Sequence, residues 1–578
     1  MQEMSRRSEE EEQGEEETED DWGPSHQRKD PPTKKTNSHI PSTIAGVLGL
    51  LFLMQLARLF VGNLLGVGRY SLIGWAIVAV VVVVAGRILI PVLMAALTRP
   101  PRAPVHPNPP TARPSPREDH TEPSPTPAAL ARDRLLRAGD GMYLGLAQDG
   151  DWATADPESA VLVLGPPRRG KTMAVMIPAA MAASGALIST STKPDVMEAT
   201  LAARSEVGQA WLFDPSGSEA VPDGVRRLSW SPVAAAVTWD EALVMARAMT
   251  AATRVGSGTT NESHWTERAE ALLAPLLYAA NQSERTIGDV LEWILYKNIE
   301  PALQILRDCD APMAVAVLAG IDGTDKREKS SIFSATSGVL SAYKSDAVRD
   351  SAANPNFDPA RFAASTDTIY ITAPEHKQAL CAPLIVGLLE QVRHANYDLA
   401  RAGGRGLDPT EHPMLWLLDE LANIAPIHDA PSLISQAGGQ NLQVVAGLQD
   451  LTQARERWGD AAADGFMSLF QTKLILNGIG DSKTLESVSL ALGEYDRETV
   501  SQSLGRSDPQ EFLSTPTHSD NVNYQTQRQR VLTPGEIGRL PKGQGLLLRG
   551  NDWETVQLTR WFQHEPWRTI GHASTAAL

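Results

Sequence analysis

The sequence predicts an α/β fold: a parallel β-sheet covered by helices on both faces, interrupted by an all-helical insertion and preceded by two transmembrane helices. Three observations predict it. Short apolar runs alternate with helical patterns along most of the chain, which is typical of a buried parallel sheet. Between residues 240 and 349, helical segments rich in Ala, Leu and Glu replace the strand-like runs. Two long apolar stretches stand near the N-terminus.

The first 97 residues predict a tail followed by a membrane hairpin. Residues 1–39 begin with a near-continuous acidic run, which favours a disordered, solvated tail, and end with basic residues. Within residues 40–97, the stretches Ile44–Gly66 and Ser71–Leu97 approach or exceed the roughly 20 residues that cross a bilayer as a helix. Lys and Arg flank both outer ends, whereas the connecting loop has only Arg69. The positive-inside bias therefore places both termini and the body in the cytoplasm.

A proline-rich linker and a folded body follow the hairpin. From Thr98 to Ala128 there are 11 prolines, so we expect residues 98–131 to form a stiff, extended spacer. The expected later parts are the sheet domain (132–239 and 350–563), the all-α insertion (240–349) and a C-terminal tail (564–578).

Eight apolar runs in the body predict the strands of the sheet. They are short, rich in β-branched and other apolar residues, and separated by helical patterns. The predicted strands are Ala160–Leu164, Ala186–Ser189, Trp211–Phe213, Thr368–Ile371, Leu415–Leu418, Leu442–Ala446, Lys473–Leu476 and Gly545–Leu548.

Charge and cysteine content exclude several classes of protein. The net charge of −17 divides into −9 for residues 1–21, +7 for residues 22–131 and −15 for the rest. An acidic body argues against a general nucleic-acid binder with a broad basic face. Two cysteines, Cys309 and Cys381, cannot form a disulfide framework, which favours a reducing compartment. A metalloprotease is also excluded, because the chain has no H-E-x-x-H motif.

A phosphate-binding loop follows the first predicted strand. The stretch has the pattern G-x-x-x-x-G-K-[ST] and precedes a predicted helix, Met173–Ala183. In this pattern backbone N–H groups surround phosphate oxygens, the lysine reaches the β- and γ-phosphates, and the hydroxyl binds Mg²⁺. The residues predicted to bind nucleotide are Gly165, Pro166, Pro167, Arg168, Arg169, Gly170, Lys171 and Thr172.

Two carboxylates after a later strand predict the rest of a hydrolytic site. Asp419 and Glu420 follow Leu415–Leu418; Asp419 is predicted to hold Mg²⁺ with Thr172, and Glu420 to act as general base. Asp214, after Trp211–Phe213, is a rival for the metal but lacks a second carboxylate. Gln449 ends the next strand, where it either orients water at the γ-phosphate or is an ordinary surface residue.

These motifs, in this order, resemble those of the type IV coupling proteins, the TraG/TraD-like ATPases of conjugation and type IV secretion. The resemblance covers most of residues 40–563 and rests on the membrane hairpin, the phosphate loop and several later motifs. These later motifs are Trp230-Ser-Pro232, His264-Trp265-Thr-Glu-Arg-Ala, Leu417-Leu-Asp-Glu-Leu-Ala422, the Gln449 segment to Gly459, Thr472-Lys-Leu-Ile-Leu and the stretch from Leu540 to Arg549.

The resemblance implies a RecA-like P-loop NTPase domain with an inserted all-α domain, anchored in the bacterial inner membrane as a two-pass homo-hexamer. It implies an ATP hydrolase with ATP and Mg²⁺ as cofactors. This enzyme would link a DNA–relaxase complex to a type IV secretion channel and drive the DNA, expected to be single-stranded, through that channel. By this resemblance Lys171, Glu420 and Gln449 are catalytic, and Thr172 and Asp419 bind the metal.

Alternatives and one departure stay open. Two other motors share the hairpin and the phosphate loop: an FtsK-like double-stranded DNA translocase and a secretion ATPase that moves protein cargo. The non-enzymatic alternative is a membrane scaffold with a vestigial nucleotide site. Many members of the family carry an arginine before the strand that leads to the glutamine, whereas Gln436–Gln440 has no basic residue here. Arg455, Arg457 and Arg268 are candidates to replace it.

Overall fold

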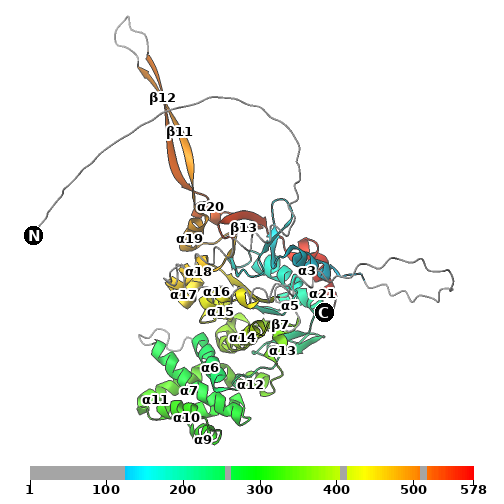
Figure 1. Cartoon of the computed structure of the whole chain (residues 1–578), viewed down its shortest axis with the longest axis vertical. Coiled ribbons are helices and arrows are strands. Elements are labelled where there is room, and N and C mark those ends of the chain that lie inside the picture. The colour runs from blue at the N-terminus through cyan, green and yellow to red at the C-terminus, as the bar shows by residue number, and fades with distance from the viewer. Residues whose placement is uncertain (1–123, 254–261, 404–412, 508–516, 578) are drawn as a thin grey trace, which may run out of the picture. The chain divides into compact units, whose positions relative to one another are not determined.

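The computed structural model describes residues 124–253, 262–403, 413–507 and 517–577. Among these residues, 12 strands form one sheet in the order β2-β1-β14-β13-β10-β3-β9-β8-β4-β7-β5-β6 (Figure 1). The bounds are β1 Met142–Leu146, β2 Trp152–Ala155, β3 Val161–Leu164, β4 Leu187–Ser191, β5 Ala210–Phe213, β6 Val225–Arg227, β7 Thr368–Thr372, β8 Met414–Leu418, β9 Leu442–Leu448, β10 Thr472–Leu476, β13 Gln544–Arg549 and β14 Asp552–Gln557.

The sheet is mixed, which corrects the prediction of a parallel one. The strands from β10 to β6 are parallel to their neighbours. Each predicted strand overlaps an observed one, but Gly545–Leu548 lies in β13, which is antiparallel to β10. A tight turn at Gly550-Asn551 then joins β13 and β14 as an antiparallel hairpin, which extends this edge of the sheet. β14, β1 and β2 continue this antiparallel edge.

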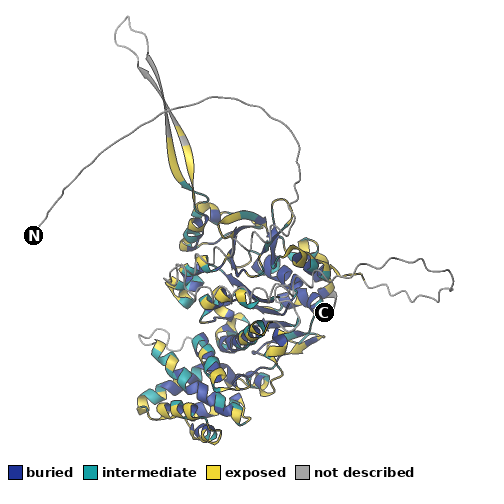
Figure 2. Cartoon of the chain, viewed as in Figure 1, coloured by how far each residue is buried: buried dark blue, intermediate teal, exposed yellow. Residues whose placement is uncertain are grey.

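The central strands are apolar along their whole length because both faces of the sheet are covered. In β3, Leu162 and Leu164 belong to one hydrophobic core, while Val161 and Val163 belong to another on the opposite face. All four side chains are fully buried, and the strands appear as buried in Figure 2. Continuous burial explains why these strands lack the alternating pattern of a half-exposed sheet.

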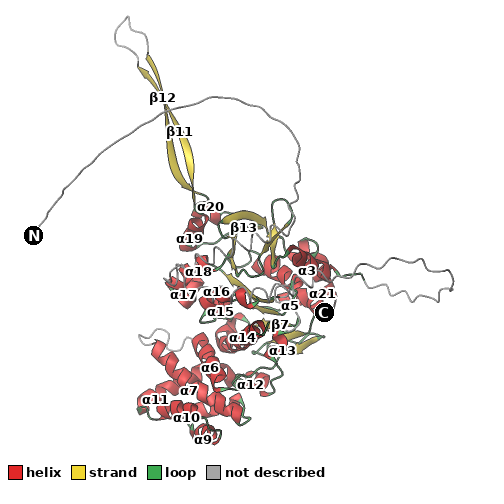
Figure 3. Cartoon of the chain, viewed as in Figure 1, coloured by secondary structure: helices red, strands yellow, loops and turns green. Residues whose placement is uncertain are grey.

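Between β6 and β7 the described residues form helices and no strand (Figure 3). This agrees with the helical pattern predicted there, while the division into a separate domain at 240–349 stays a prediction. Contacts of α6 with α7 and with α14 connect the segment to the sheet region. Its helices are α6 Trp239–Thr253, α7 Glu262–Gln282, α8 Ile287–Leu295, α9 Glu300–Asp308, α10 Pro312–Asp322, α11 Lys326–Val339, η2 Ser341–Lys344, α12 Asp346–Ala353 and α13 Pro359–Ala363.

The other helices lie around the sheet. They are α3 Pro127–Ala138, η1 Lys171–Met176, α4 Ile177–Ala182, α5 Asp195–Ser205, η3 Glu375–Lys377, α14 Gln378–Arg401, α15 Leu421–Ile424, α16 Ala430–Gln436, η4 Gly438–Gln440, α17 Leu451–Trp458, α18 Asp460–Leu469, α19 Ser482–Leu492, α20 Pro534–Gly538, η5 Trp561–Gln563 and α21 Trp567–Ala577.

Two expected boundaries differ from the structure. The linker was expected to reach residue 131, but α3 begins at Pro127 because Thr126 caps its first turn by accepting a hydrogen bond from the Ala129 N–H. The expected C-terminal tail contains α21, which packs against α5. Trp567 is fully buried there, and the Ser574 hydroxyl accepts a hydrogen bond from the backbone of Ala202. The sheet domain therefore includes the C-terminal helix.

A two-stranded ribbon, which the sequence did not predict, consists of β11 Glu494–Ser507 and β12 Thr517–Arg530. Its strands are largely polar, and they pair only with each other among the described strands. At its base Arg530 forms an ion pair with Glu486 of α19 at 2.6 Å.

The expected tail, membrane hairpin and most of the linker lie outside the described residues. Within the described ranges, no helix is long and apolar enough to cross a membrane. Cys309 and Cys381 are both free thiols.

Candidate nucleotide-binding site

The phosphate loop leaves β3 at its carboxyl end and turns into a helix. Gly170 has φ 108°, a conformation that favours glycine, and the preceding Arg168 also has a positive φ of 64°. The helix begins at Lys171 as η1, and α4 continues it from Ile177. The loop thus precedes a helix N-terminus, where backbone N–H groups and the helix dipole favour an anion.

Lys171 is held inside the site by two oxygen contacts. Its side chain is 6% exposed, and its Nζ donates a hydrogen bond to the Gly165 carbonyl oxygen at 2.6 Å. The same Nζ lies 3.9 Å from Glu420 Oε1. A buried ammonium with these neighbours is placed to bind a phosphate oxygen over the loop.

Asp419 meets Thr172 across the sheet, although 247 residues separate them in sequence. The Thr172 hydroxyl donates to Asp419 Oδ2 at 2.6 Å, and the Thr190 hydroxyl of β4 donates to the Asp419 carbonyl at 3.0 Å. The meeting follows from the strand order, since the carboxyl ends of parallel β3 and β8 lie at one edge, separated by β9.

Asp419 Oδ1 is buried and has no hydrogen-bond partner in the structure. A carboxylate oxygen without a partner, beside a threonine hydroxyl, fits Mg²⁺, because this ion prefers oxygen ligands. Its remaining ligands are usually water molecules and phosphate oxygens. Among the described residues, no group of three or more His, Cys, Asp or Glu side chains could hold a metal ion. The unpartnered Oδ1 and the adjacent Thr172 hydroxyl make Asp419 and Thr172 the residues that would hold Mg²⁺, together with oxygens of a bound nucleotide.

The rival carboxylate, Asp214, is occupied in a turn. Its side chain accepts hydrogen bonds from the backbone N–H groups of Ser216 and Glu219 and from the Ser216 hydroxyl. It follows β5, which is separated from β3 by β7, β4, β8 and β9. The structure thus brings Asp419, and not Asp214, to the phosphate loop.

Glu420 and Gln449 lie together at the same edge. Glu420 has φ 57°, and its Oε2 accepts from Asn423 Nδ2 at 3.2 Å and from Gln449 Nε2 at 3.5 Å. Gln453 Oε1 accepts from the Gln449 backbone N–H at 2.8 Å, which fixes the end of β9. Gln449 is therefore at the site rather than at an unrelated surface. The sequence analysis did not single out Asn423 and Gln453. Asn423 stands three residues after Glu420 and Gln453 four residues after Gln449, and such spacings bring side chains together on a helical turn.

The candidate arginines make contacts elsewhere. Arg455 forms an ion pair with Asp481 at 3.2 Å, and Arg268 forms one with Glu328 at 3.1 Å. Arg457 donates to backbone carbonyls, including that of Ala252 at 2.8 Å. These contacts engage Arg455 and Arg268 with carboxylates outside the phosphate loop and Arg457 with backbone carbonyls.

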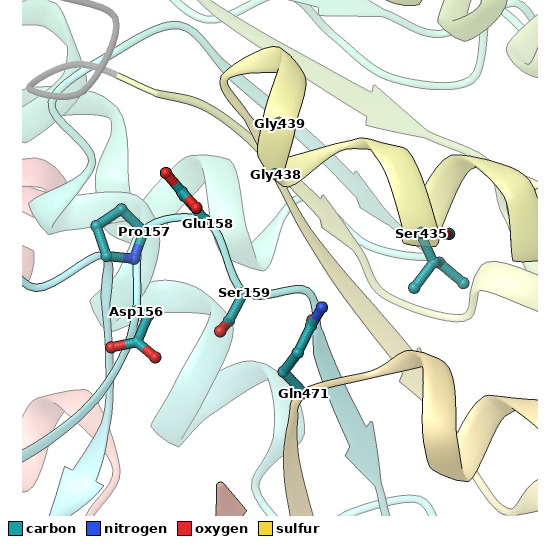
Figure 4. Close-up of a pocket in the computed structure, with 9 residues that line it drawn as sticks. Asp156, Pro157, Glu158, Ser159, Ser435, Gly438, Gly439 and Gln471 are labelled. Carbon is teal, nitrogen blue, oxygen red and sulfur yellow. The ribbon is translucent and has the colours of Figure 1, made fainter. Parts of the chain in front are cut away.

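A cavity of about 460 Å³ has none of these groups in its lining. Figure 4 shows the residues that line it. It is lined by residues just before β3, β9 and β10, at the amino ends of these parallel strands. Ligands of such sheets bind at the carboxyl ends, so we assign the nucleotide to the phosphate loop and not to this cavity. Its lining residues are Asp156, Pro157, Glu158, Ser159, Ile434, Ser435, Gly438, Gly439 and Gln471.

Replacing Asp419 with asparagine is expected to stabilise the nucleotide-free protein at neutral pH. Burial raises the pKa of Asp419 above its usual value, although the Thr172 hydrogen bond and the Lys171 ammonium oppose this. The folded chain therefore holds this proton more tightly than the unfolded chain, and the carboxylate costs stability as pH rises through the folded pKa. We therefore expect a gain in stability at neutral pH that disappears below the usual aspartate pKa.

Thermal unfolding of both proteins without Mg²⁺, at a series of pH values, measures this gain. The same substitution should remove Mg²⁺-dependent nucleotide binding. A lower unfolding temperature for the variant at neutral pH would contradict the interpretation.

Comparison with known proteins identifies the family. The profile described as "Type IV secretory system Conjugative DNA transfer" matches residues 125–572, which is more than half of the chain. The chain belongs to this family. The resemblance to type IV coupling proteins seen in the sequence is thereby confirmed.

Curated relatives of this chain include the Protein VirD4 of Rhizobium rhizogenes and that of Agrobacterium fabrum. Each is 21% identical over 438 residues, which cover 74% of this chain and 62% of the relative. The chain therefore matches less than two thirds of the length of these relatives.

Solved structures share the fold. The unbound conjugative coupling protein TrwBΔN70 has a TM-score of 0.54 at 18% identity, covering 74% of this chain and 91% of TrwB. TrwB in complex with ADP and Mg²⁺ has a TM-score of 0.52 at 18% identity, with the same coverage. At this identity the likeness shows a common α/β fold.

Proposed function

We propose that this chain is a membrane-anchored ATP hydrolase that couples a DNA–relaxase complex to a type IV secretion channel and drives DNA transfer. The observation that carries the proposal is the convergence of Lys171, Thr172, Asp419 and Glu420 at the carboxyl edge of the sheet. Membership of the conjugative DNA transfer family supports the cargo and the channel. The TrwB structures with ADP and Mg²⁺ and with a non-hydrolysable ATP analogue support ATP and Mg²⁺.

In this proposal the chain's own residues divide the work. The loop N–H groups and Lys171 bind the β- and γ-phosphates, because they offer hydrogen-bond donors and a positive charge. Glu420 accepts the proton of the attacking water, and Gln449, 3.5 Å from Glu420, helps to orient that water. Mg²⁺, when bound by Thr172 and Asp419, neutralises phosphate charge.

We further propose a two-pass anchor in the bacterial inner membrane, with both termini and the ATPase body in the cytoplasm. The apolar stretches within residues 40–97 and the basic residues on both sides of them support this topology. A homo-hexamer with nucleotide sites between subunits is part of the same proposal. Such an assembly would allow an arginine of a neighbouring subunit to act on the nucleotide, since Arg455 and Arg268 pair with carboxylates elsewhere in their own chain.

ATP hydrolysis by the detergent-solubilised full chain tests the cargo. Single-stranded DNA, double-stranded DNA and a DNA-free relaxase are added separately, at several salt concentrations, since phosphate contacts weaken with salt. We expect the largest stimulation with single-stranded DNA. Stimulation by double-stranded DNA alone would favour an FtsK-like translocase, and stimulation by protein alone would favour a secretion ATPase.

A further inference from the structure

The guanidinium of Arg169, in the phosphate loop, lies across Gly478. Gly478 follows β10 and has φ 89°. A Cβ built on it would fall 3.0 Å from Arg169 Nε, 3.1 Å from Nη2 and 3.2 Å from Cζ. Because three atoms of the guanidinium are almost equally close, the group covers the glycine rather than touching it with one tip. A side chain at position 478 would compete with Arg169 for this place.

No ion pair or hydrogen bond satisfies Arg169 within the described chain, in contrast to Arg455 and Arg457. A guanidinium offers five N–H donors, and Arg169 is not fully buried, so a ligand can reach its guanidinium. Arg169 is half-buried. Its contact with Gly478 holds one side of the group and leaves the donors for a ligand.

The place of Arg169 on the sheet indicates which part of a nucleotide it meets. The residues assigned to the terminal phosphate, Lys171, Glu420 and Gln449, follow β3, β8 and β9 respectively. β10 flanks β3 on the other side, with Ile475 opposite Leu164 at the last paired position. Arg169 and Gly478 therefore lie on the β10 side of the loop, away from these groups, and this is the side that we assign to the nucleoside.

We propose that Arg169 is a nucleobase-binding residue whose planar guanidinium stacks on the base while Gly478 supports its other side. Guanidinium groups stack on flat aromatic surfaces, and arginine does this better than lysine because its charge is planar and weakly hydrated. The inference rests on the proposed function, since it assigns a part of the same nucleotide site.

Calorimetric titration of the full chain with Mg²⁺ and either ATP, ADP or inorganic tripolyphosphate tests the proposal. Arg169→Ala should weaken ATP and ADP about 10-fold each and leave tripolyphosphate unchanged. Arg169→Lys should behave like the alanine variant, because it keeps the charge but loses the plane. Arg226→Ala, an exposed arginine of β6 at the far edge of the sheet, is the matched control and should change nothing.

Several results would overturn the inference. One is an unchanged ATP affinity in Arg169→Ala. Another is an equal loss for tripolyphosphate, which would make Arg169 a phosphate ligand, and a third is full recovery in Arg169→Lys. Thermal unfolding of each variant identifies misfolding independently of the titration. A wild-type chain that binds no ATP overturns this inference and the proposed function together, whereas any of the other results overturns only the inference.

Discussion

Replacing Lys171 with alanine is expected to weaken binding of Mg²⁺·ATP by the full chain about 100-fold, equivalent to losing charge-assisted hydrogen bonds worth about 3 kcal/mol. The Lys171 ammonium is 6% exposed and lies between the Gly165 carbonyl and the Glu420 carboxylate. Without the Lys171 ammonium, no positive charge of the loop helix would separate the ATP phosphates from the Glu420 carboxylate, and the two would repel each other. Titration of wild type and variant measures the change.

Lys326→Ala is the matched control for this experiment. Lys326 is an exposed lysine at the start of α11, in the helical segment and not in the phosphate loop. The Lys326→Ala variant should bind ATP as tightly as the wild type does. A Lys171→Ala variant that binds ATP within about threefold of the wild type would show that the loop does not hold the phosphates as described.

Replacing Glu420 with glutamine is expected to leave ATP binding intact and to slow hydrolysis by about 10²–10⁴-fold, the range of general base catalysis. Glutamine has the same shape and keeps an oxygen that can accept from Asn423 and Gln449, but it cannot take a proton from water. Removal of the negative charge also lowers repulsion of the γ-phosphate, so ATP affinity should stay equal or rise. Phosphate release and ATP titration separate the two effects.

Glu292→Gln, at an exposed position of α8, controls for the loss of one carboxylate. It should hydrolyse ATP at the wild-type rate. Near-normal turnover in Glu420→Gln would exclude Glu420 as the base and would require another group to activate the water.

The sequence predicted most of the strands that are buried on both faces, but it missed the fully buried β1, and it also missed the strands with exposed or polar residues. The run Val161–Leu164 is apolar throughout because each face of the sheet has its own core. In contrast, Val225–Arg227 has two exposed arginines, and the long strands Glu494–Ser507 and Thr517–Arg530 are polar. A strand without an apolar face leaves no periodic pattern to detect.

The sequence contains a signal for the antiparallel edge of the sheet, although the prediction did not use it. The Gly550-Asn551 dipeptide between two strand-like runs is typical of a hairpin, and β13 and β14 form one there. The assumption of a parallel sheet outweighed this local signal.

The site was partly predictable for a topological reason. Lys171 and Asp419 both follow apolar runs, and parallel strands carry their carboxyl ends to one edge, so their meeting could be expected. The contact of Arg169 with Gly478 could not be expected, because it depends on β10 being the neighbour of β3. The motifs do not determine the order of the strands in the sheet.

The measurement that most directly tests the central claim is the rate of ATP hydrolysis by the full chain, titrated with single-stranded DNA, with Glu420→Gln as the background. The account predicts a wild-type rate that rises with DNA and falls again with added salt, while the variant stays at background throughout. A wild-type rate equal to that of Glu420→Gln at every DNA and salt concentration, in a preparation that binds ATP and is assembled as an oligomer, would contradict it.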